Sequence, residues 1–181
     1  NENKSIVFSE WSHEEYSPGI LIEEEISKIN IKNYANKDLE DSFLWIVVKG
    51  SDSRITALSL GQIESKKWTI NSVELKNVKY PAKLIAIEVF EPSSEDNSKP
   101  FELNLSSIEL INSNNNLVKN IPFDNSLNWT ELPTSEGFDS SISYNSEGLI
   151  LNLGNGSTKG IRGMYLSNYD QGIPVIVNNK F

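Results

Sequence analysis

Glu23 and Glu25 are the acidic residues whose spacing could support catalysis. Two carboxylates suffice for glycoside hydrolysis, in which one serves as the acid and the other as the base or nucleophile. On a strand, residues two positions apart point to the same face of the sheet, as in some β-sandwich glycosidases. However, Glu23-Glu24-Glu25 has no aromatic residue within several positions that could shape a sugar cleft. We therefore interpret the triplet as a solvated run of charge.

The single histidine, His13, is the other candidate for acid–base or nucleophilic chemistry. Its neighbours Ser12, Glu14 and Glu15 offer a hydroxyl and carboxylates, but the sequence lacks the Gly-x-Ser-x-Gly motif of a nucleophile elbow. We interpret His13 as an exposed residue in a polar segment. The glycine-rich stretch from Gly154 to Gly160 does not have the phosphate-loop spacing, so we predict a turn there.

Two acidic stretches could supply oxygen ligands for a calcium ion. One contains Asp38, Glu40 and Asp41, and the other contains Glu95, Asp96 and Asn97. Neither has the residue order of an EF-hand loop with its central glycine. We predict no metal site and no cofactor, with one structural calcium ion as an open alternative.

The four tryptophans are the candidates for stacking against a sugar ring: Trp11, Trp45, Trp68 and Trp129. Trp45 lies within an apolar run and Trp68 begins another, so we expect both to pack in the core or at a strand edge. Trp129 lies beside Asn128 and Thr130 in loop-rich surroundings. We therefore predict that Trp129 is the exposed tryptophan and the ligand-binding residue.

The composition excludes several other classes of site. The chain has 181 residues, no cysteine and one histidine, which excludes disulfides, thiolate metal sites and multi-histidine metal sites. Its formal net charge is −9, which argues against a nucleic-acid partner because no net positive field would displace phosphate counterions. The 22 Asn and 25 Ser residues favour turns and local hydrogen bonds over helix interiors.

The elements that must position these residues have the pattern of strands. Apolar residues form short runs separated by turn chemistry, as expected of a sandwich or a barrel. In Lys83–Phe90 the residues Ile85, Ile87 and Val89 alternate, and we predict that they face the inside of a two-layer sandwich. The alternation after Phe101 slips near Ser106-Ser107, which predicts a β-bulge. Segments 141–144 and 149–153 flank Asn145-Ser146-Glu147-Gly148 and predict a hairpin.

A helix is possible only at Glu23–Asn30, where a competing pattern favours strands with a turn at Ser27-Lys28. We predict strands there. No run of 18 or more apolar residues could span a membrane. The chain starts without a methionine and ends soon after the apolar run Ile173–Val177, so we expect a soluble region cut from a longer protein.

The order of the segments resembles a jelly-roll module of the carbohydrate-binding type. The resemblance rests on Phe43–Gly50, Trp68 with Val73 and Leu75, Lys83–Pro92, and Leu103–Leu110. Such modules usually carry Asp-Asp in the last of these strands, where this chain has Ser106-Ser107. The segment Gly172–Asn178 resembles the strand that follows an inserted sandwich in the extracellular regions of FtsX-like ABC transporter permeases.

These resemblances imply a bacterial, extracytoplasmic and non-catalytic domain at the outer face of the cell membrane. Its partners would be the transmembrane helices of the same parent chain, a separate ATPase subunit, and a glycan or protein ligand, with a role in binding or mechanical coupling. We expect one all-β domain over residues 1–172, a jelly-roll-type antiparallel β-sandwich with its core at about 40–155, and a following segment at 173–181. The alternatives are a carbohydrate-binding module of a secreted glycosidase and a sandwich glycosidase that uses Glu23 and Glu25.

Overall fold

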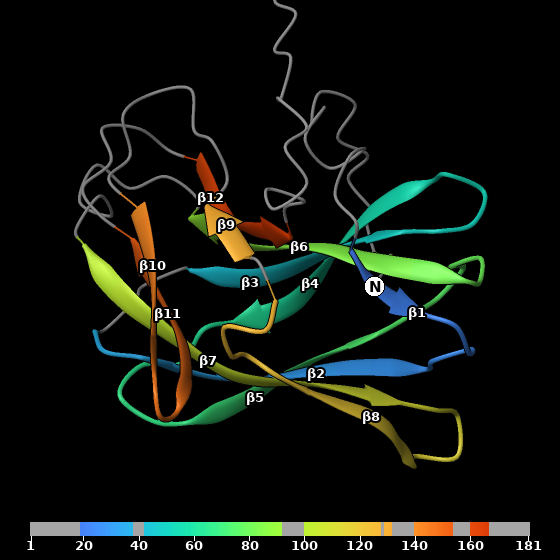
Figure 1. Ribbon diagram of the computed structural model, residues 1–181, viewed down its shortest axis with the longest axis horizontal. Coiled ribbons are helices and arrows are strands. Elements are labelled where there is room, and N and C mark those ends of the chain that lie inside the picture. Colours follow the sequence, from blue (N-terminus) through green and yellow to red (C-terminus); the bar gives the residue numbers. More distant parts are fainter. Residues whose placement is uncertain are drawn as a thin grey trace, which may run out of the picture.

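Two antiparallel sheets make up the fold in the computed structural model, which describes residues 19–37, 42–91, 100–127, 129–131, 140–153 and 160–166. Figure 1 shows the sheets as two layers, with β3, β4 and β6 above β2, β5, β7 and β8. Sheet A has the order β4 (Ile55–Gln62), β3 (Phe43–Lys49), β6 (Ala82–Glu91), β12 (Gly160–Leu166) and β9 (Trp129–Glu131), and β1 (Ile20–Ile22) also pairs with β6. Sheet B has the order β10 (Ser140–Asn145), β11 (Gly148–Leu153), β7 (Phe101–Ile111), β2 (Lys28–Ala35) and β5 (Thr69–Glu74), and β8 (Leu117–Pro122) also pairs with β7.

The predicted all-β antiparallel sandwich is confirmed, and the jelly-roll arrangement stays a prediction. The described residues contain no helix. The segment Glu23–Asn30, where a helix was the alternative, forms no helix. Glu23–Ser27 connect strand β1 to strand β2. Sheet A and sheet B share one apolar core, because a half-buried sheet must cover its apolar face with another layer.

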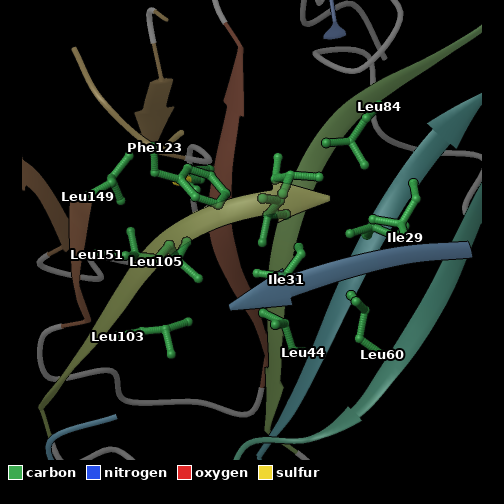
Figure 2. Close-up of a cluster of buried hydrophobic side chains, with 14 of the residues drawn as sticks. Ile29, Ile31, Leu44, Leu60, Leu84, Leu103, Leu105, Phe123, Leu149 and Leu151 are labelled. Atoms are coloured by element: carbon green, nitrogen blue, oxygen red, sulfur yellow. The ribbon is translucent and has the colours of Figure 1, made fainter. Parts of the chain in front are cut away.

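The core lies between the two sheets and is made largely of aliphatic side chains. In Figure 2 Ile29 and Ile31 of β2 and Leu103 and Leu105 of β7 meet Leu44 of β3 and Leu84 of β6, all at most 1% exposed. Met164 of β12 also belongs to this cluster. The core therefore includes side chains from strands before residue 40 and after residue 155, as well as from the strands between them.

The predicted bulge in β7 is confirmed. Lys32 of β2 pairs with Ser107, while the next residue, Asn33, pairs with Leu105, so Ser106 is the extra residue of β7. The bulge lets Leu105 and Ile108 both enter the core although three positions separate them. The sequence slip near Ser106-Ser107 thus has a direct structural cause.

The predicted facing of β6 is wrong at Ile85. Val47 of β3 pairs with Ala86 and Val48 pairs with Leu84, which makes Ile85 the extra residue of a second bulge. Leu84, Ile87 and Val89 enter the main core, whereas Ile85 and Ala86 pack with Val47 and Ala57 in a separate cluster. A bulge reverses the facing of all residues on one side of it, and its position depends on the partner strand.

The hairpin is confirmed as β10 and β11. Asn145 pairs with Gly148 across the turn, and Asn145 Oδ1 accepts hydrogen bonds from the backbone N–H of Glu147 (2.8 Å) and of Gly148 (3.1 Å). Gly148 has φ +142° and lies against the carbonyl oxygen of Leu105, where a side chain would not fit. The hairpin is thereby joined to the central strand β7 of sheet B.

Candidate functional site

The prediction that Trp129 is the exposed tryptophan is wrong. Trp129 lies in β9 and is 6% exposed, in the core cluster. Its ring packs against Phe123 with centroids 5.6 Å apart, and its Nε1 is buried without a hydrogen-bond partner. Loop-like neighbours in the sequence did not reveal that β9 pairs with β12 and turns the indole inward. A ligand-binding role for Trp129 stays a prediction, and the site described below does not include it.

Trp68 is the exposed tryptophan among the described residues. It is 36% exposed and immediately precedes β5, at the edge of sheet B. Trp45, by contrast, is half-buried on the outer side of sheet A and meets Phe90 edge-on at 6.3 Å. The expected packing of Trp45 is confirmed, whereas Trp68 presents much of its ring to solvent.

Three side chains surround Trp68 on the outer face of sheet B: Lys32, Tyr34 and Ile70. Together with Trp68 they are here called the Trp68 cluster. Lys32 and Tyr34 alternate on β2 with Ile31 and Asn33, which are 0% exposed, so they point outward. Lys32 pairs with Ile70 across the strands. The Tyr34 and Trp68 rings are tilted with centroids 5.7 Å apart, and Lys32 Nζ lies 5.4 Å from the Trp68 centroid. These contacts hold the indole in place and leave Ile70 57% exposed.

The first half of β5 reverses the usual distribution of polarity. Ile70 faces outward, with Trp68 just before it, while Thr69 and Asn71 face inward. The second half has the usual facing, since Val73 packs against the core and Ser72 and Glu74 are exposed. Burying amides while exposing large apolar groups costs free energy unless the amides are hydrogen-bonded. The exposed Trp68 and Ile70 are therefore the unusual feature of this strand.

A buried amide network offsets part of this cost, while Asn33 Oδ1 and Thr69 Oγ1 are buried without a hydrogen-bond partner. Asn33 Nδ2 donates to Asn71 Oδ1 at 2.9 Å and to Ile31 O at 3.2 Å. Asn71 Nδ2 in turn donates to the carbonyl oxygens of Gln62 (2.9 Å) and Leu60 (3.2 Å) of β4. Because β4 belongs to sheet A and β5 to sheet B, Asn71 ties the two sheets together at the crossover that carries Trp68.

The rest of the outer face of sheet B beside this cluster is polar. Asn30 Nδ2 donates to Glu109 Oε2 at 3.0 Å, and Ser72 Oγ donates to Asn30 Oδ1 at 2.7 Å. Asn104 of β7 pairs with Tyr34 on one side and with Ile150 of β11 on the other. Hydroxyl and amide groups therefore lie across several strands next to an aromatic surface, an arrangement that can bind a polar ligand with an apolar face.

Glu23 and Glu25 do not lie on a strand. Both are exposed in the connection between β1 and β2, so the condition that would have aligned them on one face of a sheet is not met. Two exposed carboxylates in a connection lack the enclosed cleft in which a glycosidase holds its sugar. The interpretation of this triplet as a solvated run of charge is consistent with its position.

The remaining candidates lie outside the described residues. These are His13 and Trp11, the calcium candidates Asp38, Glu40, Asp41, Glu95, Asp96 and Asn97, the stretch from Gly154 to Lys159, and the Gly172–Asn178 segment. Within the described ranges, no group of three or more His, Asp or Glu side chains could hold a metal ion.

Local contacts shift the pKa values of three ionisable groups among the described residues. Burial raises the pKa of Tyr80, whose hydroxyl donates to Ile26 O at 2.8 Å. A hydrogen bond and the positive charge of Lys76 lower the pKa of Glu74, and hydrogen bonds from Ser126 lower that of Asp124. These shifts come from local structural contacts.

Comparisons with known proteins add no relative. No protein-family model matches the chain, and neither a curated protein nor a solved structure matches it. In the part of the chain that the structure describes, no helix is long and apolar enough to cross a membrane. The functional argument therefore depends on the residues themselves.

Proposed function

We propose that this chain is a non-catalytic recognition domain that binds a carbohydrate on the outer face of sheet B, with Trp68 as the stacking residue. The observation that carries the proposal is the inverted polarity of β5, which exposes Trp68 and Ile70 while Asn71 is buried. A sugar ring has an apolar face that suits an indole and a rim of hydroxyls that suits Asn and Ser side chains.

The arrangement of the outer face supports an extended ligand. A sheet presents its outward side chains in rows across the strands, and Tyr34, Asn104 and Ile150 occupy one such row beside Trp68. From Trp68 across the strands, this row thus presents aromatic rings, then an amide, then an aliphatic side chain. A chain of sugar units could follow this row.

The wider placement is a second part of the proposal. We propose that the domain belongs to the extracytoplasmic part of an FtsX-like ABC transporter permease, on the basis of the Gly172–Asn178 segment. Carbohydrate recognition would then be its binding role, and a carbohydrate-binding module of a secreted glycosidase is the alternative. The parent coding sequence separates them, because apolar helices would flank the domain in a permease and a catalytic domain would lie beside it in a glycosidase.

The binding proposal is tested by calorimetric titration of the 181-residue chain with neutral and acidic polysaccharides. We expect saturable binding that Trp68→Ala weakens at least about 30-fold, the effect of losing an aromatic anchor worth about 2 kcal/mol. Tyr144→Ala is the matched control, since Tyr144 is a 39% exposed aromatic residue on β10 that pairs with the buried Leu149 and so lies outside the Trp68 cluster. The proposal is wrong if no polysaccharide binds or if Trp68→Ala binds as the wild type does.

A further inference from the structure

Lys32 is a cation placed beside the proposed stacking surface. It lies on the outer face of β2, exposed, between Ile70 of β5 and Ser107 of β7 in the register of the strands. Its ammonium group lies 5.4 Å from the centroid of the Trp68 ring. The ammonium group of Lys32 and the Trp68 ring therefore adjoin each other closely enough for one sugar unit to contact both.

Two carboxylates on the neighbouring strands, those of Glu74 and Glu109, have hydrogen-bonding or ionic partners other than Lys32. Glu74 pairs with Lys76 at 2.6 Å, and Glu109 accepts a hydrogen bond from Asn30. Lys67, which directly precedes Trp68, pairs with Glu64. Among the described residues Lys32 makes no ion pair, so its charge is available to a ligand.

This local charge is opposite in sign to that of the whole chain. The net charge of −9 repels anions at long range, and screening at physiological ionic strength confines that repulsion to about 8 Å. A site for an anion on such a protein needs an uncompensated cation at short range. Lys32 meets that requirement with its ammonium group over the Trp68 ring.

We infer that the carbohydrate is acidic, a polysaccharide with uronic acid units, and that Lys32 binds its carboxylate while Trp68 stacks on the same sugar ring. The inference rests on the proposed function and names its ligand class. A uronic acid carries its carboxylate directly on the sugar ring, so one unit presents both groups to the cluster. Charge complementarity at Lys32 thus selects among sugars that Trp68 alone would accept.

The test compares each acidic polysaccharide with its own neutral derivative. Polygalacturonate, alginate and hyaluronan are titrated against the 181-residue chain beside the same polymers after reduction of their carboxyl groups to alcohols. We expect at least one acidic form to bind about fivefold tighter than its reduced form, which corresponds to about 1 kcal/mol for an exposed ion pair. The difference should shrink with added salt, because the pair is exposed.

Variants of Lys32 assign the effect to this residue. Lys32→Met should remove the preference for the acidic form while it keeps the affinity for the reduced form, and Lys32→Arg should retain the preference. Lys119→Met, at an exposed lysine of β8, is the matched control and should leave both affinities unchanged. Equal affinities for charged and reduced polymers, lost together in Trp68→Ala, would overturn the acidic ligand and leave the proposed function standing. Absence of binding to every polymer would overturn both.

Discussion

Asn33 and Asn71 are joined inside the sandwich by a hydrogen bond of 2.9 Å, behind the half-buried Tyr34 and the exposed Trp68. Asn33 precedes Tyr34 on β2, and the amides point inward where the aromatic rings point outward. The direction of each bond is fixed by the next one, since Asn71 Nδ2 donates to two carbonyl groups of β4 and leaves its Oδ1 to accept from Asn33. The interior network and the exterior cluster therefore share the same two strands.

Asn71→Ala should destabilise the domain by about 2 kcal/mol, because it removes one acceptor of Asn33 Nδ2 and the donor to the Leu60 and Gln62 carbonyl groups. Urea unfolding followed by circular dichroism measures this change. Asn120→Ala, at an exposed position of β8, is the control and should change the free energy of unfolding by less than about 0.5 kcal/mol. Equal stability of the two variants would mean that the network does not tie sheet A to sheet B.

Gly148→Ala should destabilise the domain more than Gly61→Ala does. Both glycines have positive φ, +142° and +99°, so both substitutions strain the backbone. At Gly61 the nearest atom to the added carbon is Asn71 Nδ2 at 3.8 Å, whereas at Gly148 the carbon would overlap the Leu105 carbonyl. We expect a loss of about 1 kcal/mol at Gly61 and of at least about 3 kcal/mol at Gly148.

The same unfolding measurement compares the two alanine variants directly. Equal losses would show that backbone strain alone, and not the contact between β11 and β7, makes glycine necessary at the hairpin. A Gly148→Ala variant that is as stable as the wild type would contradict the described pairing of these strands.

Tyr80 should make stability fall at alkaline pH. Burial raises its pKa above the ordinary value of 10.0, so the folded state favours the neutral phenol. The resulting stabilisation is complete below pH 10 and is lost as the pH rises through the pKa of the folded state. We expect the difference in unfolding free energy between the wild type and Tyr80→Phe to be largest at pH 8 and smaller at pH 11. A difference that stays constant with pH would contradict the burial of this hydroxyl.

The strands and the turns were largely predictable because their signals are local. The alternation in β7, the slip at Ser106-Ser107 and the Asn145–Gly148 turn each depend on residues adjacent in the chain, and the structure confirms them. The facing of Ile85 depends on where β3 places its register shift, which no pattern within β6 records. Local patterns thus specify where the strands and turns lie, but not always which residues of a strand face the core.

The exposure of Trp68 and the burial of Trp129 escaped prediction for a related reason. In β5 and the residue before it, one alternating set holds Trp68, Ile70, Ser72 and Glu74, and the other holds Thr69, Asn71 and Val73. Neither set is uniformly apolar, so the sequence does not say which faces the core. The hydrogen bonds of Asn71 to β4 determine which set faces the core. The pairing of β9 with β12 likewise buries Trp129. The sequence signal that could have pointed to Trp68 is the polar pair Thr69 and Asn71, because such side chains can face inward when a neighbouring strand accepts their hydrogen bonds.

The most direct test of the Trp68 surface is a titration followed by nuclear magnetic resonance of the tryptophan indole N–H groups. The polysaccharide that binds most tightly in the calorimetric titration is added to the ¹⁵N-labelled chain, and each indole signal is assigned by a Trp→Phe variant. We predict that the Trp68 signal shifts saturably while the Trp129 signal stays in place, because only Trp68 lies on the outer face of sheet B. A shift of the Trp129 signal with Trp68 unmoved, or no shift of either, would contradict the account.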